Sequence, residues 1–347
     1  MNSSALIIVD DKLLLPHILN YLYKFNFKNV VLFKKKNFKI NLNLLKGYNF
    51  NITILNYTEN QFNYNLLKNK EISKHLDNNF LLLKTSRFIN LNLFNLYKIY
   101  LKNNNKLTLT IHKKNNRYFN TEIFFIKKKI LNYYDFAFID IFKNPNYKLN
   151  FTDNEFINLR TIKLKKKKII NNFFSNIYSR AVILDRDGVI NVNKGYVGFK
   201  KDFIFQSGAI KAIKYLNKFN YNIFVVSNQS GIARGYYTDN DVKKLHNYLR
   251  DTLEKKQIFI NKIYYSPYHK DGIIKKYIKN SSCRKPGIKL FSTLSKEWGI
   301  KNKSKIIMIG DQASDIEFAK NAKIKSALFK KGNLYNFIKK LGLSEKI

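Results

Sequence analysis

The chain has 347 residues, of which 45% are hydrophobic and 15% are aromatic. That composition excludes a disordered or collagen-like chain, and the single cysteine excludes a disulfide scaffold. At roughly 150 residues per domain, the length predicts two domains. No run approaches the roughly 18 apolar residues of a membrane helix, so we expect a cytoplasmic protein without membrane contact.

The net charge is +41, which is typical of proteins that bind nucleic acid or an anionic surface. The lysines, however, are spread along the whole chain, together with many Asn, Ile, Phe and Tyr residues, and A/T-rich codons encode all five residue types. We therefore interpret the charge as compositional and expect no nucleic-acid partner. Attraction of phosphorylated ligands is a by-product of this charge.

In the first half of the chain, strand and helix patterns alternate, which predicts an α/β domain with parallel strands over residues 1–160. The predicted strands are 5–9, 29–33, 80–83 and 106–111, and the predicted helices are 14–25 and 91–103. Residues 161–179 contain the charge run Lys163-Leu164-Lys165-Lys166-Lys167-Lys168, which predicts a basic, solvated linker or helix face.

Residues 180–347 show the same alternation more clearly. The predicted strands are 181–184, 222–226, 262–265, 305–309 and 326–329, with a helical repeat over 209–216 and a helix that begins at Thr238. Asp241, three residues later, completes a capping-box pattern. This α/β pattern predicts a doubly wound parallel sheet, in which active sites lie beyond the carboxyl ends of the strands.

The first chemical motif is Leu184-Asp185-Arg186-Asp187-Gly188, directly after a predicted strand. Residues two apart on an extended segment project to the same side, so Asp185 and Asp187 face one small volume. Two carboxylates that close repel each other, which requires a proton or a cation such as Mg²⁺ between them. One carboxylate could attack phosphorus while the other transfers protons.

Three further motifs follow in order: Val225-Val226-Ser227-Asn228-Gln229-Ser230-Gly231, Arg284-Lys285-Pro286 and Ile309-Gly310-Asp311-Gln312-Ala313-Ser314-Asp315. They offer hydroxyl and amide groups for phosphate oxygens, two cations, and carboxylates for a metal. Each motif alone is a weak signal. All four in this order, three of them directly after strands, predict a phosphoryl-transfer site.

With these motifs, residues 180–332 resemble the haloacid dehalogenase (HAD) superfamily phosphatases. The match is to subfamily IIIA, without a large cap, which includes D-glycero-D-manno-heptose 1,7-bisphosphate 7-phosphatases and histidinol phosphatases. The resemblance implies a phosphoric monoester hydrolase in which Asp185 is the nucleophile, forming an aspartyl-phosphate, and Asp187 is the general acid and base.

The resemblance also implies the ligands of this chemistry. Mg²⁺ would be bound by Asp185, Asp311 and the backbone carbonyl of Asp187, with Asp315 supporting these ligands. The residues implied for phosphate and substrate binding are Ser227, Asn228, Gln229, Arg234, Arg284 and Lys285.

The segments Gly195-Tyr196-Val197 and 228–237 look like the heptose bisphosphate phosphatases. They imply a small phosphorylated sugar as the partner and removal of its C7 phosphate, in nucleotide-heptose and lipopolysaccharide precursor synthesis. The alternatives are a histidinol-phosphate phosphatase, a polynucleotide 3′-phosphatase, and a basic nucleic-acid-binding protein on a phosphatase-like scaffold. No oligomeric state follows from the sequence.

The heptose family usually carries a Cys-x-His and Cys-x-Cys zinc site, which is altered here. The matching segments are Ser266-Pro267-Tyr268 and Ser281-Ser282-Cys283. Hydroxyl groups are poor zinc ligands, so the substitutions at Ser266, Tyr268 and Ser281 predict that no zinc binds.

Residues 1–160 faintly resemble the sugar nucleotidyltransferases. The stretches that carry this resemblance are 14–22, 80–83 and 90–110. The Gly-rich loop expected near Val9 is absent, and Lys84-Thr85-Ser86 replaces the expected metal-binding Asp. We expect a degenerate, inactive domain; a Rossmann-like domain of unrelated origin is the alternative.

Overall fold

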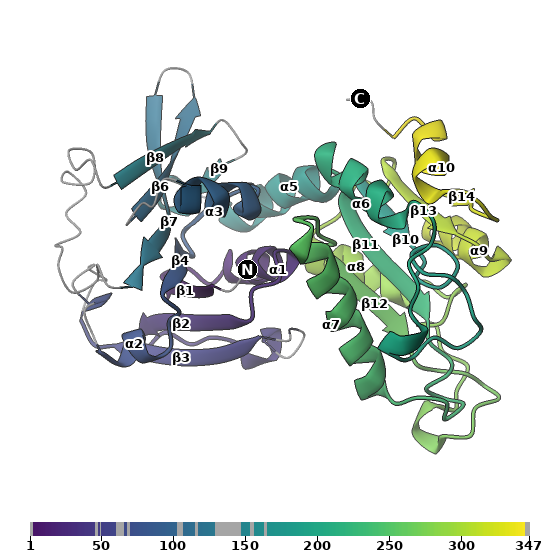
Figure 1. Ribbon diagram of the computed structural model, residues 1–347. Coiled ribbons are helices and arrows are strands. Elements are labelled where there is room, and N and C mark those ends of the chain that lie inside the picture. Colours follow the sequence, from purple (N-terminus) through teal and green to yellow (C-terminus); the bar gives the residue numbers. More distant parts are fainter. Residues whose placement is uncertain are drawn as a thin grey trace. The chain divides into compact units, whose positions relative to one another are not determined.

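The computed structural model describes residues 3–45, 48, 50–59, 66–67, 70–102, 107–114, 117–128, 147–152, 156–162 and 165–343. The chain divides into two compact units, Met1–Ile170 and Asn171–Ile347 (Figure 1). The division lies inside helix α5 (Lys166–Tyr178), within the segment predicted as a basic linker. Residues 163–164 of the predicted charge run lie outside the described residues.

The first unit contains a seven-stranded sheet in the order β3-β2-β1-β4-β7-β6-β8. Its strands are β1 (Ser4–Val9), β2 (Asn29–Lys35), β3 (Asn51–Tyr57), β4 (Asn79–Lys84), β6 (Leu107–Lys114), β7 (Arg117–Lys127) and β8 (Tyr147–Thr152). The remaining elements are α1 (Leu15–Lys24), α2 (Lys70–Lys74), α3 (Leu93–Lys102) and the pair β5 (Arg87–Ile89) and β9 (Phe156–Asn158).

This unit confirms the predicted strands near 5–9, 29–33, 80–83 and 107–111 and both predicted helices; Lys106 and Asn103, at two predicted boundaries, lie outside the described residues. The expectation of parallel strands is wrong for β7, which runs antiparallel to both β4 and β6. Only two residues separate β6 from β7, too few for the crossover that parallel neighbours require.

The second unit contains a five-stranded sheet in the order β12-β11-β10-β13-β14, parallel throughout, which confirms the predicted doubly wound fold. Its strands are β10 (Ala181–Leu184), β11 (Asn222–Asn228), β12 (Lys262–Ser266), β13 (Ile306–Gly310) and β14 (Lys325–Leu328). All four residues of β10 are buried, as expected for a central strand with both faces covered.

Helices cover both faces of this sheet (Figure 1). They are α6 (Ala209–Lys218), α7 (Asp239–Lys255), α8 (Lys289–Trp298), α9 (Ala313–Ala322) and α10 (Leu334–Lys340). Val182 and Leu184 share a hydrophobic core with residues of α6, α7 and α10. The predicted capping box at the start of α7 is confirmed: Thr238 Oγ1 accepts from Asp241 N, and Thr238 N donates to Asp241 Oδ2. Short 3₁₀ turns lie at Leu42–Leu44, Leu159–Thr161, Lys200–Asp202 and Lys275–Tyr277.

On the opposite face, Trp298 at the end of α8 is fully buried. Its ring meets the edges of Tyr178 from α5 and Phe224 from β11, with centroids 4.9 and 5.1 Å away. Its Nε1 donates a hydrogen bond to Tyr264 Oη at 2.9 Å. Helices and aromatic side chains therefore cover both faces of the sheet, and the functional side chains lie at the carboxyl ends of its strands.

Candidate active site

Polar residues gather at the carboxyl ends of the three middle strands of the second unit. Asp185 follows β10 directly, Ser227 lies near the end of β11, and Asp311 follows β13. Because β10 pairs with β11 on one side and with β13 on the other, the chain connections diverge at this edge. Open α/β sheets bind their ligands at such a point.

The side chain of Lys285 connects the third motif to the others. Its Nζ lies 2.6 Å from Asp185 Oδ1, 2.5 Å from Asp315 Oδ1 and 2.8 Å from the carbonyl oxygen of Val226. Asn228 holds the Lys285 backbone, since its Oδ1 accepts from Lys285 N at 2.9 Å and its Nδ2 donates to Lys285 O at 3.1 Å. Both ends of the Asn228 amide are therefore engaged within the protein.

Three carboxylates converge beside this ammonium group. Among the described residues, Asp185, Asp311 and Asp315 each offer one oxygen within 4.8 Å of the others, a set that could hold a metal ion. The buried Oδ1 of Asp311 has no hydrogen-bond partner in the described part of the chain. A buried oxygen of this kind is costly unless a cation or proton approaches it. Oxygen-only donors suit a hard divalent cation, so the residues present fit Mg²⁺.

Two glycines allow the carboxylates to approach the backbone closely. Gly188 has φ +90°, and a Cβ at this position would lie 2.2 Å from Asp311 Oδ2. A Cβ at Gly310 would lie 2.2 Å from side-chain atoms of Asp315. Glycine in the first motif therefore makes room for the Asp311 carboxylate of the fourth.

The crowding of charge shifts the pKa values of these groups. Burial raises the pKa of Asp185 to about 7; Lys285 opposes this shift, and the carboxylates of Asp315 and Asp187 add to it. Burial also raises the pKa of Asp311. Although burial lowers the pKa of Lys285, Asp185 and Asp315 outweigh it and raise that pKa overall. One ammonium group among three carboxylates leaves negative charge, which a bound cation would balance.

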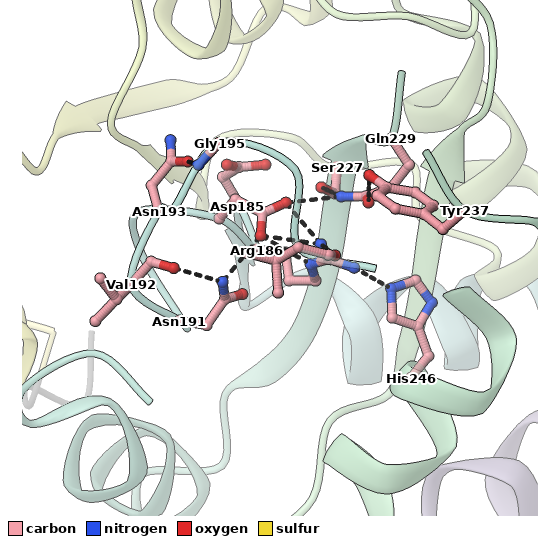
Figure 2. Close-up of polar contacts among 12 residues, drawn as sticks. Asp185, Arg186, Asn191, Val192, Asn193, Gly195, Ser227, Gln229, Tyr237 and His246 are labelled. Carbon is pink, nitrogen blue, oxygen red and sulfur yellow. Dashed lines mark hydrogen bonds and ion pairs between the residues drawn. The ribbon is translucent and has the colours of Figure 1, made fainter. Parts of the chain in front are cut away.

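The Asp187 carboxylate lies in a separate network of hydrogen bonds (Figure 2). Arg186 Nη2 donates to its Oδ2 at 2.8 Å, Asn191 Nδ2 to its Oδ1 at 2.9 Å, and Gln229 Nε2 to its Oδ2 at 2.8 Å. The same Gln229 nitrogen donates to Ser227 Oγ at 2.8 Å. Asp187 does not belong to the converging carboxylates, and the metal role implied for it concerns only its backbone carbonyl.

Four residues to which no sequence motif assigns a role complete this network: Arg186, Asn191, Tyr237 and His246. Arg186 is fully buried, and its Nη1 lies 3.2 Å from His246 Nε2. Burial, followed by the neighbouring arginines, lowers the pKa of His246 well below its usual range, so the neutral ring can accept this hydrogen bond. The sequence does carry one signal for His246. It lies four residues after Val242, so the two residues share the apolar face of α7, and a histidine on that face is predicted to be buried.

Two arginines form a second basic group: Arg284, which precedes Lys285 in the sequence, and Arg234. Arg234 Nη2 is 3.4 Å from His269 Nε2. Burial and the charges of Arg284 and Arg234 together lower the pKa of His269. Burial and the charge of Arg234 also lower the pKa of Arg284. The buried Arg234 Nε and Arg284 Nη1 have no hydrogen-bond partner among the described residues. Two guanidinium groups with unpaired, buried N–H groups are suited to an anionic ligand.

The loop that follows Ser266, the last residue of β12, carries Tyr268 and Ser281 and is held by hydrogen bonds and packing. Ile273 N and Ile274 N both donate to Ala233 O, at 2.8 and 3.0 Å. Lys279 Nζ lies 4.1 Å from the centre of the Tyr268 ring, a cation–π contact. Ser281 Oγ accepts from Cys283 N at 3.2 Å.

Known proteins resemble this half of the chain. A family model described as HAD-hydrolase-like matches residues 282–335. The D-glycero-beta-D-manno-heptose-1,7-bisphosphate 7-phosphatase of Rhodopseudomonas palustris is 37% identical over 161 residues, which are 46% of this chain and 89% of the relative. The chain belongs to the HAD-like phosphatases.

A second relative, the D-glycero-alpha-D-manno-heptose-1,7-bisphosphate 7-phosphatase of Campylobacter jejuni, is 36% identical over 47% of this chain and 92% of its own. The solved D,D-heptose 1,7-bisphosphate phosphatase of B. bronchiseptica, complexed with magnesium and phosphate, is 23% identical over 46% of this chain and 86% of its own, with a TM-score of 0.40. This HAD-like phosphatase is thus a phosphoric monoester hydrolase related to heptose bisphosphate 7-phosphatases.

The first unit of this phosphatase has its own polar cluster, at the ends of β1 and β4. The Asp10 carboxylate accepts hydrogen bonds from Ser86 N at 2.8 Å, Ser86 Oγ at 2.7 Å, Thr85 Oγ1 at 3.1 Å and Arg160 Nη2 at 2.9 Å. Residues of the unit itself therefore engage this carboxylate.

None of the described helices of either unit is long and apolar enough to span a membrane.

Proposed function

We propose that the second unit removes the C7 phosphate of D-glycero-D-manno-heptose 1,7-bisphosphate, with Mg²⁺, in nucleotide-heptose and lipopolysaccharide precursor synthesis. Asp185 attacks phosphorus in line with the leaving oxygen, and an aspartyl-phosphate forms as the bond to O7 breaks. Asp187 gives its proton to O7, then takes one from the water that hydrolyses the acyl phosphate. The nucleophile and both proton positions are thereby restored.

The surrounding residues neutralise and orient the phosphoryl group. Asp185, Asp311 and the backbone carbonyl of Asp187 would hold Mg²⁺, which supplies positive charge to the phosphoryl oxygens. Lys285 supplies a second cation beside the nucleophile, and Ser227 offers a hydroxyl. Asp315 holds Lys285 in place from the other side. This arrangement meets the main needs of phosphoryl transfer, namely positioning and charge neutralisation.

The observation that carries the choice of a bisphosphate is the pair Arg234 and Arg284. Arg284 directly precedes the Lys285 that contacts the nucleophile, and Arg234 lies close enough to Arg284 to lower its pKa. Each arginine has a buried N–H group without a partner among the described residues. A monophosphate needs only the cations at Asp185. A second phosphate, on the far side of a small sugar, would bind to the two guanidinium groups.

The test compares heptose 1,7-bisphosphate with heptose 7-phosphate, which lacks the second phosphate, in wild type and in Arg284→Ala. We expect wild type to prefer the bisphosphate about 100-fold in kcat/KM, equal to roughly 3 kcal/mol at 1.4 kcal/mol per tenfold. The variant should lose this preference while it keeps activity on the monophosphate. An equal loss on both substrates would contradict the assignment.

Histidinol phosphate and a 3′-phosphorylated oligonucleotide complete the panel, with Asp185→Asn as the blank. Preference for the oligonucleotide, with a steep salt dependence, would mean that the +41 charge is functional. Preference for histidinol phosphate, which has a single phosphate, would mean that Arg234 and Arg284 do not bind a second phosphate.

We also propose that the first unit is a degenerate nucleotidyltransferase-like domain that does not catalyse nucleotidyl transfer. The carboxylate of Asp10 is engaged by Thr85, Ser86 and Arg160, and the sequence supplies neither a Gly-rich loop after β1 nor an aspartate directly after β4. Titration calorimetry with nucleoside triphosphates and Mg²⁺ should show no heat of binding. Saturable binding would overturn this proposal.

A further inference from the structure

The side-chain amide of Gln229 links two residues of the proposed mechanism. Its Nε2 donates to Asp187 Oδ2 and to Ser227 Oγ, both at 2.8 Å. Its Oε1 accepts a hydrogen bond from Tyr237 Oη at 3.0 Å (Figure 2). Gln229, Ser227 and Tyr237 are all buried, so water does not offer an easy substitute for these contacts.

While Asp187 is ionised, the amide satisfies this network in one orientation only. If it were flipped, Oε1 would face the Asp187 carboxylate, and two acceptors would meet at hydrogen-bond distance. The Tyr237 hydroxyl supports the observed orientation by donating to Oε1. Ser227 Oγ accepts from Gln229, which leaves its own hydroxyl hydrogen available for a phosphoryl oxygen.

The ring of Tyr237 lies in a narrow slot between two glycines. A Cβ at Gly198 would lie 2.1 Å from ring atom Cδ1, and one at Gly231 would lie 2.3 Å from ring atom Cζ. Neither glycine has φ in the left-handed range that requires glycine for the backbone. The space for the ring is therefore the property that only glycine provides at these two positions.

Two further residues also hold the Asp187 carboxylate. Arg186 reaches both carboxylate oxygens, while its other contacts, with His246 Nε2 and the carbonyl oxygen of Val197, keep the guanidinium in place. Asn191 Nδ2 adds a third donor. Arg186, Asn191 and the Tyr237–Gln229 pair together thus fix the position of the Asp187 carboxylate.

We propose that Tyr237 is a positioning residue of the phosphatase reaction. Through the Gln229 amide, it holds the Asp187 carboxyl group where it can protonate the leaving alcohol. This inference rests on the proposed function, since it requires Asp187 to be the general acid. It adds Tyr237, outside the four motifs, to the residues on which the rate of the chemical step depends.

Tyr237→Phe tests the inference, because it keeps the ring in its slot and removes only the hydroxyl. The variant is compared with wild type on the best alkyl phosphate of the panel and on p-nitrophenyl phosphate. The p-nitrophenolate ion leaves without protonation, so its release does not need the general acid. We expect kcat on the alkyl phosphate to fall about 10- to 100-fold, within the range that general acid catalysis contributes. KM and the rate of p-nitrophenolate release in a single turnover, before the aspartyl-phosphate is hydrolysed, should remain close to wild type.

Two further variants bracket this result. Asp187→Asn should show the same selectivity in leaving-group release with a larger loss, and it should also slow hydrolysis of the aspartyl-phosphate from both substrates. Tyr264→Phe removes another buried hydroxyl of the same unit, one that donates to Glu297 Oε2 at 2.6 Å, and should leave both substrates unaffected. Circular dichroism and urea unfolding report whether each variant folds.

The outcomes separate the inference from the proposed function. Equal losses in single-turnover leaving-group release from both substrates, or unchanged rates on both in a folded Tyr237→Phe protein, would overturn the inference alone. A wild-type protein that releases no phosphate from either substrate would overturn the proposed function itself.

Discussion

Gly188→Ala is the substitution for which the structure makes the most detailed prediction. Gly188 has φ +90°, and a left-handed backbone of this kind costs a residue with a Cβ about 1–3 kcal/mol. The added methyl group would also lie 2.2 Å from Asp311 Oδ2, whereas real Cβ contacts do not come closer than 3.0 Å. The Asp311 carboxylate must therefore retreat, or the turn must open.

Gly332→Ala is the matched control. Gly332 has φ +103° in the same unit, but a Cβ there would meet nothing within 4 Å. Both variants should lose about 1–3 kcal/mol of unfolding free energy in urea. Only Gly188→Ala should also lose activity, by about 100-fold, because displacement of a catalytic group by about 1 Å has a cost of that order.

The assay is p-nitrophenyl phosphate hydrolysis over a range of Mg²⁺ concentrations. The Mg²⁺ needed for half-maximal activity should rise in Gly188→Ala, since Mg²⁺ tolerates little departure from octahedral geometry. It should remain at the wild-type value in Gly332→Ala. Equal activities of the two variants would refute the reasoning that links the first and fourth motifs through this glycine.

Three further predictions concern the charges and the helix cap. Lys285→Met should lower the unfolding free energy by about 3–5 kcal/mol in chelator, because it leaves the buried Asp185 and Asp315 without their cation; a loss below about 1 kcal/mol would contradict this. Since burial raises the pKa of Asp185 from 3.8 to about 7, stability in chelator should fall as the pH rises between these values. Mg²⁺ competes with that proton, so it should raise Tm more at about pH 8 than at about pH 6, and Asp185→Asn should remove the difference. Thr238→Ala should cost about 0.5–2 kcal/mol in urea unfolding and leave kcat unchanged, because it removes only the capping box of α7.

The second unit could be predicted closely because its strands are short apolar runs with polar motifs at their ends. Asp185, Ser227 and Asp311 each follow or end such a run, and parallel strands must bring their carboxyl ends to one edge. The first unit was harder to predict. The apolar pattern over β7 does not reveal the direction of the strand, and in β3 only Tyr57 is buried.

The Asp187 network could not be predicted from the sequence, for a physical reason. Tyr237 and His246 reach the site by packing between elements that are distant in the sequence, and no spacing rule relates them to Asp187. The space that holds the Tyr237 ring depends on Gly198 and Gly231, which read as ordinary loop glycines until the fold brings them together.

Trp298 has a practical consequence. It is the one tryptophan of the sequence, it lies entirely within the second unit, and aromatic rings and a hydroxyl group surround it. Its fluorescence emission therefore reports the unfolding of the phosphatase unit alone, whereas far-ultraviolet circular dichroism reports both units. Urea titrations followed by both signals give coincident curves only if the two halves unfold together. The single indole thus makes the coupling between the halves measurable in the unmodified protein.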